Sequence, residues 1–111
     1  GARDAFLAPY DTPAHRLATL RFVQDIPLDA RDRAWPIVET TGAALAQFAD
    51  RPMLLAWGLR DFVFDVTFLA EWRRRFPSAR VHEYPDAGHY MLEDAHERFL
   101  PAVRDFLEST A

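Results

Sequence analysis

The stretch that most constrains the fold of this chain is Met53–Trp57, an unbroken run of apolar residues between Pro52 and Gly58. A run this short is typical of a strand covered on both faces of a sheet, because a buried helix needs a longer apolar pattern. An amphipathic helical pattern follows at residues 65–77, and ARVHEYP (residues 79–85) then alternates like an edge strand with one wetter face. Two strands separated by a helix of this length pair in parallel through a right-handed crossover. The sequence therefore predicts an α/β fold.

Helical segments are expected before and after this β–α–β unit. Three precede it and one follows it: residues 1–10, ending near Pro9; a helix capped by Asp11 or Thr12; a helix starting near Pro36; and a final helix, Asp94–Ser109. Pro101 predicts a kink in the final helix, because a proline inside a helix removes a hydrogen bond. Glu93 and Asp94 are expected to cap that helix, and Asp65 is expected to be the N-cap of the helix between the strands.

The composition excludes several classes of function. The 111 residues suffice for one domain, and a net charge of −4 without a long basic block argues against a nucleic-acid surface. The chain has no cysteine, so disulfides, thiolate metal sites and a cysteine nucleophile are excluded. No apolar run approaches the roughly 20 residues that a membrane span needs, and the first residues lack the pattern of a secretion signal. We therefore expect a cytoplasmic protein that binds neither nucleic acid nor a membrane.

Two residues with catalytic chemistry follow the two predicted strands. Asp61 comes shortly after the first strand, in WGLRDF, and His89 comes shortly after the second, in PDAGHY. Functional groups gather at the carboxyl ends of strands in open α/β sheets, and parallel neighbours bring these ends together. We therefore expect Asp61 to hold one ring nitrogen of His89, which leaves the other nitrogen free to act as a general base. Gly58 and Gly88 are expected to permit the tight turns that present these side chains.

These segments resemble the C-terminal end of the α/β-hydrolases. WGLRDFVF and FPSARVHEYPDAGHYMLEDAHERFLPAVRDFL are most similar to the haloalkane dehalogenase branch, including its related β-lactone decarboxylases. LRFVQDIPL (residues 20–28) resembles the segment by which the helical cap of those enzymes returns to the main domain. The resemblance implies a partial α/β-hydrolase fold, namely the last two parallel strands with flanking helices, plus the end of the helical cap. Residues 1–30 would be the end of the cap, and residues 31–111 the C-terminal part of the core.

The resemblance also implies a reaction. Asp61 would be the acid and His89 the base of a nucleophile–His–acid triad, and a water activated by His89 would cleave an ester intermediate. The expected activity is haloalkane dehalogenase-like hydrolysis of a small apolar substrate, without a cofactor.

Four aromatic residues are candidates for lining the substrate pocket: Phe22, Phe62, Phe64 and Tyr90. A plain core position is the alternative for each of them. The remaining histidines lack the HExxH-type spacing of a metal pair, so no metal site is expected.

The nucleophile of such a triad has no candidate in this chain. It should lie in a G-x-[S/D]-x-G-like elbow ahead of the acid in chain order. No two of the glycines are close enough to frame an elbow, and neither Ser78 nor Ser109 is placed like one. Asp65 is better explained as a helix cap. We therefore expect the C-terminal portion of a larger hydrolase that is inactive alone; the alternative is a non-catalytic interaction module derived from a hydrolase.

A two-stranded parallel sheet is also expected to need a partner. Parallel strands are normally flanked and covered, and the Met53–Trp57 strand would expose an unpaired edge. We expect the chain either to self-associate or to bind the missing N-terminal part of its own protein.

Overall fold

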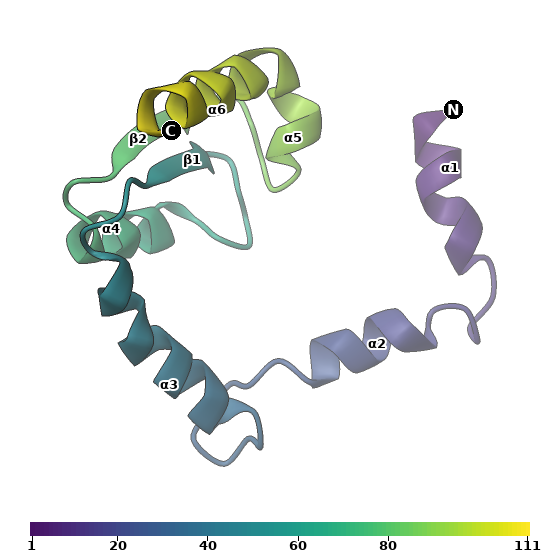
Figure 1. Ribbon diagram of the computed structural model, residues 1–111. Helices are drawn as coiled ribbons and strands as arrows, with labels where there is room; N and C mark the ends of the chain where they lie inside the picture. The colour runs from purple at the N-terminus through teal and green to yellow at the C-terminus, as the bar shows by residue number, and fades with distance from the viewer. The chain divides into compact units, whose positions relative to one another are not determined.

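The computed structural model describes all residues from Gly1 to Ala111 and divides them into two compact units, Gly1–Ala44 and Leu45–Ala111. Figure 1 shows the elements of both units in chain order. The boundary after Ala44 differs from the division after Ala30 expected from the sequence. That division separated cap from core, and the assignment of residues 1–30 to a cap stays a prediction.

The first unit consists of short helices and has no buried residue. Its elements are α1 (Ala2–Leu7), the 3₁₀ helix η1 (Ala8–Tyr10), α2 (Leu17–Gln24) and α3 (Trp35–Ala44). The predicted start of α2 is wrong. Thr12 accepts a hydrogen bond from the His15 backbone N–H at 3.2 Å, but this bond closes only a turn, and the α-helix begins at Leu17. None of the helices in the chain is long and apolar enough to cross a membrane.

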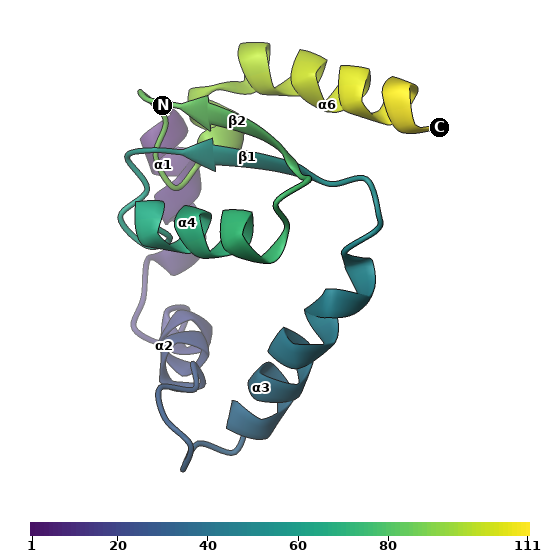
Figure 2. The same ribbon diagram turned by 90° about the vertical axis from the view of Figure 1, so that its left-hand side faces the viewer.

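The second unit contains the predicted β–α–β arrangement. Its elements are η2 (Leu45–Phe48), β1 (Leu54–Gly58), α4 (Val66–Arg75), β2 (Arg80–Tyr84), α5 (Met91–Asp94) and α6 (His96–Thr110). β1 and β2 pair in parallel, with Leu55 opposite Val81 and Gly58 opposite Tyr84, which confirms the predicted pairing. α4 lies along one face of this sheet and α6 along the other (Figure 2). A parallel pair covered on both faces is typical of an α/β fold.

Local sequence signals explain where α4 begins and which side it buries. The Asp65 side chain accepts a hydrogen bond from the Thr67 backbone N–H at 2.8 Å, so Asp65 is the N-cap, as predicted. Leu69 lies in the first half of α4 and Phe76 directly follows its last residue, and only 3% of the surface of each is exposed. The helix therefore holds its apolar side against the sheet.

The final helical region differs from the single helix predicted from the sequence. α5 ends at Asp94, Ala95 leaves the helical conformation with φ −136° and ψ 19°, and α6 continues through Pro101 to Thr110. Ala95 is 3% exposed and packs with Tyr84 and Ala87 in a small core. Since residue 95 is neither glycine nor proline, no local signal marks the break, which coincides with the buried contact of Ala95.

Candidate catalytic site

The loops that follow β1 and β2 are joined by backbone hydrogen bonds. The Leu59 N–H donates to the Tyr84 carbonyl at 3.0 Å, and the Arg60 N–H donates to the Ala87 carbonyl at 2.9 Å. Both donors belong to the first loop, whereas the acceptors belong to the end of β2 and to the second loop. The two loops are therefore held side by side at the point where Asp61 and His89 leave the sheet.

Gly58 is required by this close approach of the loops. A Cβ atom at Gly58 would lie 2.5 Å from the Gly88 carbonyl oxygen and 2.7 Å from the Ala87 carbonyl oxygen. A Cβ atom at Gly88 would have its nearest neighbour, Asp94 Oδ2, at 3.4 Å. No glycine in the chain has a positive φ, so neither Gly58 nor Gly88 has the conformational role expected for it. At Gly58 the absence of a side chain is what allows the two loops to approach so closely.

Asp61 and His89 face each other across the two loops. Nδ1 of His89 lies 3.1 Å from each carboxylate oxygen of Asp61, which confirms the proximity predicted from the sequence. Asp61 Oδ1 also accepts hydrogen bonds from the backbone N–H groups of Val63 at 2.8 Å and Phe64 at 2.9 Å. The Asp61 side chain is 11% exposed and the His89 side chain 32%. The backbone N–H groups of the first loop thus fix the Asp61 carboxylate, and this carboxylate in turn fixes the orientation of the His89 imidazole.

The Asp61 carboxylate stays ionised despite its burial. Burial raises the pKa of Asp61, but hydrogen bonds from the Phe64 N–H, from His89 and from the Val63 N–H together lower the pKa below its usual value. At neutral pH Asp61 therefore accepts a hydrogen bond from the Nδ1–H group of His89. In that tautomer the lone pair is on Nε2, which has no hydrogen-bond partner within the chain.

Aromatic rings surround the imidazole of His89. The ring centroids of Phe62, Phe64 and Tyr90 lie 6.0, 5.7 and 5.7 Å from the centroid of the imidazole. The structure therefore brings three of the four predicted pocket residues, Phe62, Phe64 and Tyr90, to His89. Phe62 is 84% exposed, so its ring offers an apolar surface beside a potential base. The substrate-binding roles of these residues stay predictions.

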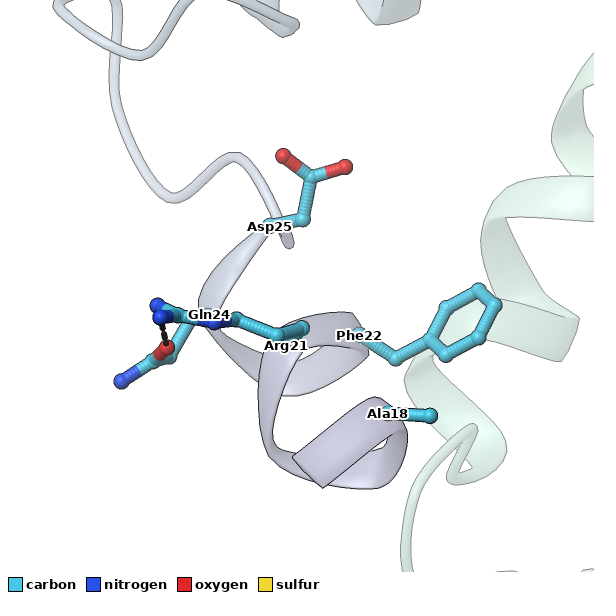
Figure 3. Close-up of a pocket in the computed structure, with 5 residues that line it drawn as sticks. All are labelled: Ala18, Arg21, Phe22, Gln24 and Asp25. Atoms are coloured by element: carbon cyan, nitrogen blue, oxygen red, sulfur yellow. Dashed lines mark hydrogen bonds between the residues drawn. The ribbon is translucent and has the colours of Figure 1, made fainter. Parts of the chain in front are cut away.

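Phe22 lies in the other compact unit, on α2. It lines a hollow of about 560 Å³ together with Ala18, Arg21, Gln24 and Asp25 (Figure 3). Arg21 Nη1 donates to Gln24 Oε1 at 3.0 Å, and this pair extends away from the Phe22 ring (Figure 3). The expected place of Phe22 beside the substrate stays a prediction.

Asp94 contacts the second loop, whereas the sequence predicted a capping role for it. Its Oδ2 atom accepts a hydrogen bond from the Gly88 N–H at 2.8 Å. The N-cap of α6 is Ala95, and no side chain caps that helix, so the capping predicted for Glu93 and Asp94 is wrong. Sequence reasoning missed the contact because it depends on the unpredicted break between α5 and α6. No group of three or more potential metal ligands accompanies these residues or occurs elsewhere in the chain.

The sequence matches the alpha/beta hydrolase fold family over residues 13–96, more than half of the chain. The chain therefore belongs to the alpha/beta hydrolase fold family, as the resemblance predicted. It is 54% identical over 106 residues to a cis-3-alkyl-4-alkyloxetan-2-one decarboxylase of Xanthomonas campestris pv. campestris, and 48% identical over 108 residues to a protein of the same name from Shewanella oneidensis. It is 27% identical over 100 residues to haloalkane dehalogenase 2 of Mycobacterium bovis.

The three alignments cover nearly all of this chain and a minor part of each relative. The alignment with the Xanthomonas protein covers 96% of this chain and 35% of the relative, and that with the Shewanella protein covers 97% and 34%. The alignment with haloalkane dehalogenase 2 covers 89% of this chain and 35% of the relative. The chain thus spans about a third of the length of the curated relatives it matches, which fits a partial α/β-hydrolase fold.

Proposed function

We propose that this chain is the C-terminal part of an enzyme of the alpha/beta hydrolase fold family, to which it contributes two members of a nucleophile–His–acid triad. Asp61 is the acid and His89 is the base. The observation that carries the proposal is the contact of His89 Nδ1 with both carboxylate oxygens of Asp61 at 3.1 Å. The nucleophile belongs to the remaining two-thirds of the longer protein, judged from the length of the relatives.

The geometry of the two residues supports these roles. Asp61 fixes the tautomer of His89 and stabilises the positive charge that forms when Nε2 takes a proton. In a hydrolytic reaction, Nε2 removes a proton from water while the water oxygen attacks the ester carbonyl; the ester C–O bond then breaks, which separates the product from the nucleophile. The rings of Phe62, Phe64 and Tyr90 lie beside His89 and offer an apolar surface for the apolar part of the substrate.

The substrate class that we place first is a small β-lactone, a cis-3,4-dialkyl oxetan-2-one. The relatives named for that decarboxylation are 54% and 48% identical to the chain, compared with 27% for haloalkane dehalogenase 2. Loss of carbon dioxide breaks the O1–C4 and C2–C3 bonds of the ring and forms a C3–C4 double bond. The atoms balance without water and without a cofactor. Dehalogenase-like hydrolysis, placed first from the resemblance, becomes the second candidate because of the lower identity.

Product analysis on the longer protein tests this order. With a cis-3,4-dialkyl oxetan-2-one, we expect an alkene and carbon dioxide in equal amounts, whereas hydrolysis would give a β-hydroxy acid. Halide release from a 1-haloalkane, without alkene from the lactone, would favour the dehalogenase candidate. No turnover of either compound, by a longer protein that lacks a nucleophile elbow, would favour the alternative of a non-catalytic interaction module.

A further inference from the structure

Both chain neighbours of His89 are hydrogen-bonded to the same residue, Asp94. The Asp94 side chain accepts a hydrogen bond from the Gly88 N–H, at 2.8 Å from Oδ2. The Asp94 backbone N–H donates to the Tyr90 carbonyl oxygen at 3.0 Å. The backbone on either side of His89 is therefore held by one residue of α5, and the origin of the imidazole side chain depends on where Asp94 lies.

Asp94 itself has a fixed place in the fold. It is the last residue of α5, and Ala95, which follows it, is 3% exposed. Ala95 packs with Tyr84 at the end of β2 and with Ala87 in the second loop. The backbone at Asp94 is thus anchored to the end of the sheet, so its side chain can serve as a firm support for the loop that carries the imidazole.

No other contact replaces this support at Gly88. The Arg60 N–H holds the Ala87 carbonyl at 2.9 Å, which fixes the second loop only up to the preceding residue. The ion pair between Asp86 and Arg98, at 2.8 Å, also joins this loop to a helix, but both side chains are exposed. Exposed ion pairs contribute little to the stability of a structure. The bond to the Gly88 N–H is therefore the contact that fixes the loop directly before the imidazole.

We propose that Asp94 is a positioning residue for His89. It holds the backbone of His89 where Nδ1 lies 3.1 Å from both carboxylate oxygens of Asp61. The inference rests on the proposed triad, to which it adds a residue that acts through His89. A displacement of about 1 Å at such a position can lower turnover by about 100-fold.

The tautomer of His89 tests this role without a substrate. Nitrogen NMR of the ring nitrogens is measured on the longer protein, at a pH at which the imidazole is neutral. In the unchanged protein we expect the proton on Nδ1, because Asp61 accepts it. Asp94→Ala removes the acceptor of the Gly88 N–H, and the displaced ring is expected to exchange between its two tautomers. Residue 94 is exposed and alanine favours a helix, so we expect this variant to fold.

Two further variants separate the loss of the acceptor from the loss of the charge. Asp94→Asn removes the charge but keeps an oxygen that can accept from the Gly88 N–H, so the proton should stay on Nδ1 of His89. Glu93→Ala removes the neighbouring carboxylate of α5, which is exposed and does not bind the Gly88 N–H. It should also leave the tautomer unchanged. Only Asp94→Ala is therefore expected to alter it.

The hydrolytic reaction gives a second measurement, with whichever of the two test compounds the longer protein hydrolyses. His89 activates the water that cleaves the ester in this route, so a displaced ring should slow that step. We expect Asp94→Ala to lower kcat by about 10- to 100-fold without raising KM. Asp94→Asn and Glu93→Ala should stay within about threefold of the unchanged protein. A general distortion of the substrate pocket would instead raise KM.

The outcomes of the NMR experiment separate the two proposals. An Asp94→Ala protein that keeps the proton on Nδ1 of His89 would overturn the positioning role, whatever its turnover. An equal change of tautomer in Asp94→Asn or Glu93→Ala would also overturn it, because the bond to the Gly88 N–H would then not be the cause. An unchanged protein without the proton on Nδ1 would contradict the contact with Asp61, on which the proposed function itself rests.

Discussion

Replacing His89 by glutamine in the longer protein is expected to lower turnover in the hydrolytic reaction, the one in which water must be activated, by about 10²- to 10⁴-fold. The glutamine amide can still donate a hydrogen bond to Asp61, whose oxygens now lie 3.1 Å from His89 Nδ1. It has no basic nitrogen in the place of Nε2 and cannot take a proton. The loss therefore reports the base function, while the contact to the acid is kept. Steady-state kinetics on the best substrate measures it.

The same variant separates the two candidate reactions. In the hydrolytic route, water must cleave an ester of the nucleophile, so His89→Gln should accumulate that ester as an added mass on the intact protein. In the decarboxylation of an oxetan-2-one, the nucleophile would open the ring at C4; loss of carbon dioxide from C3 then expels the nucleophile from C4 as the C3–C4 double bond forms. No water is needed, and no adduct should accumulate. Intact-mass spectrometry after mixing with the lactone and with a haloalkane therefore distinguishes the routes.

His96→Gln is the matched control, because its Nδ1 contacts only the backbone carbonyl of Glu93, at 3.4 Å, and no carboxylate holds it. It should keep turnover within about twofold of the unchanged protein, since surface substitutions have small effects. If His89→Gln loses less than tenfold, or if His96→Gln loses as much, His89 is not the base.

The fold of the second unit could be predicted because its signals are local. The strand is predicted by a short apolar run between Pro52 and Gly58, and the helix by an amphipathic pattern capped by Asp65. Neither prediction needs a tertiary contact. The start of α2 was misplaced because a capping residue, Thr12, closes a turn whether or not a helix continues from it. The break at Ala95 is not predicted because no local sequence signal marks it; it coincides with the burial of Ala95.

The candidate site was predictable only as far as topology fixes it. Parallel pairing of neighbouring strands brings the loops that carry Asp61 and His89 to the same edge of the sheet. Glycine is needed at position 58 because carbonyl oxygens of the other loop lie close to it. No sequence pattern encodes the positions of those oxygens. Asp94 illustrates the same limit, since its partner Gly88 is set by the turn between α5 and α6.

Replacing Gly58 by alanine is expected to destabilise the loops and the site together. The new Cβ atom would fall 2.5 and 2.7 Å from two carbonyl oxygens, distances at which the backbone must move. The hydrogen bonds of Leu59 to the end of β2 and of Arg60 to the second loop resist that movement, so relief of the clash requires their loss or strain. Overpacking of this kind costs about 1–3 kcal/mol in the free energy of unfolding. Denaturant unfolding of the longer protein measures the loss.

Gly88→Ala provides the control for Gly58→Ala, because it adds the same methyl group to the facing loop. Its Cβ would lie 3.4 Å from Asp94 Oδ2, an ordinary van der Waals distance that requires no rearrangement. We expect Gly88→Ala to change the free energy of unfolding by less than about 1 kcal/mol. Gly58→Ala should also weaken the contact between Asp61 and His89, because both leave the sheet through the strained loops, and turnover should fall more than stability alone explains. Equal stability of the two alanine variants would show that the loops do not approach as closely as the Gly58 contacts require, and the geometry of the acid and base would lose its structural basis.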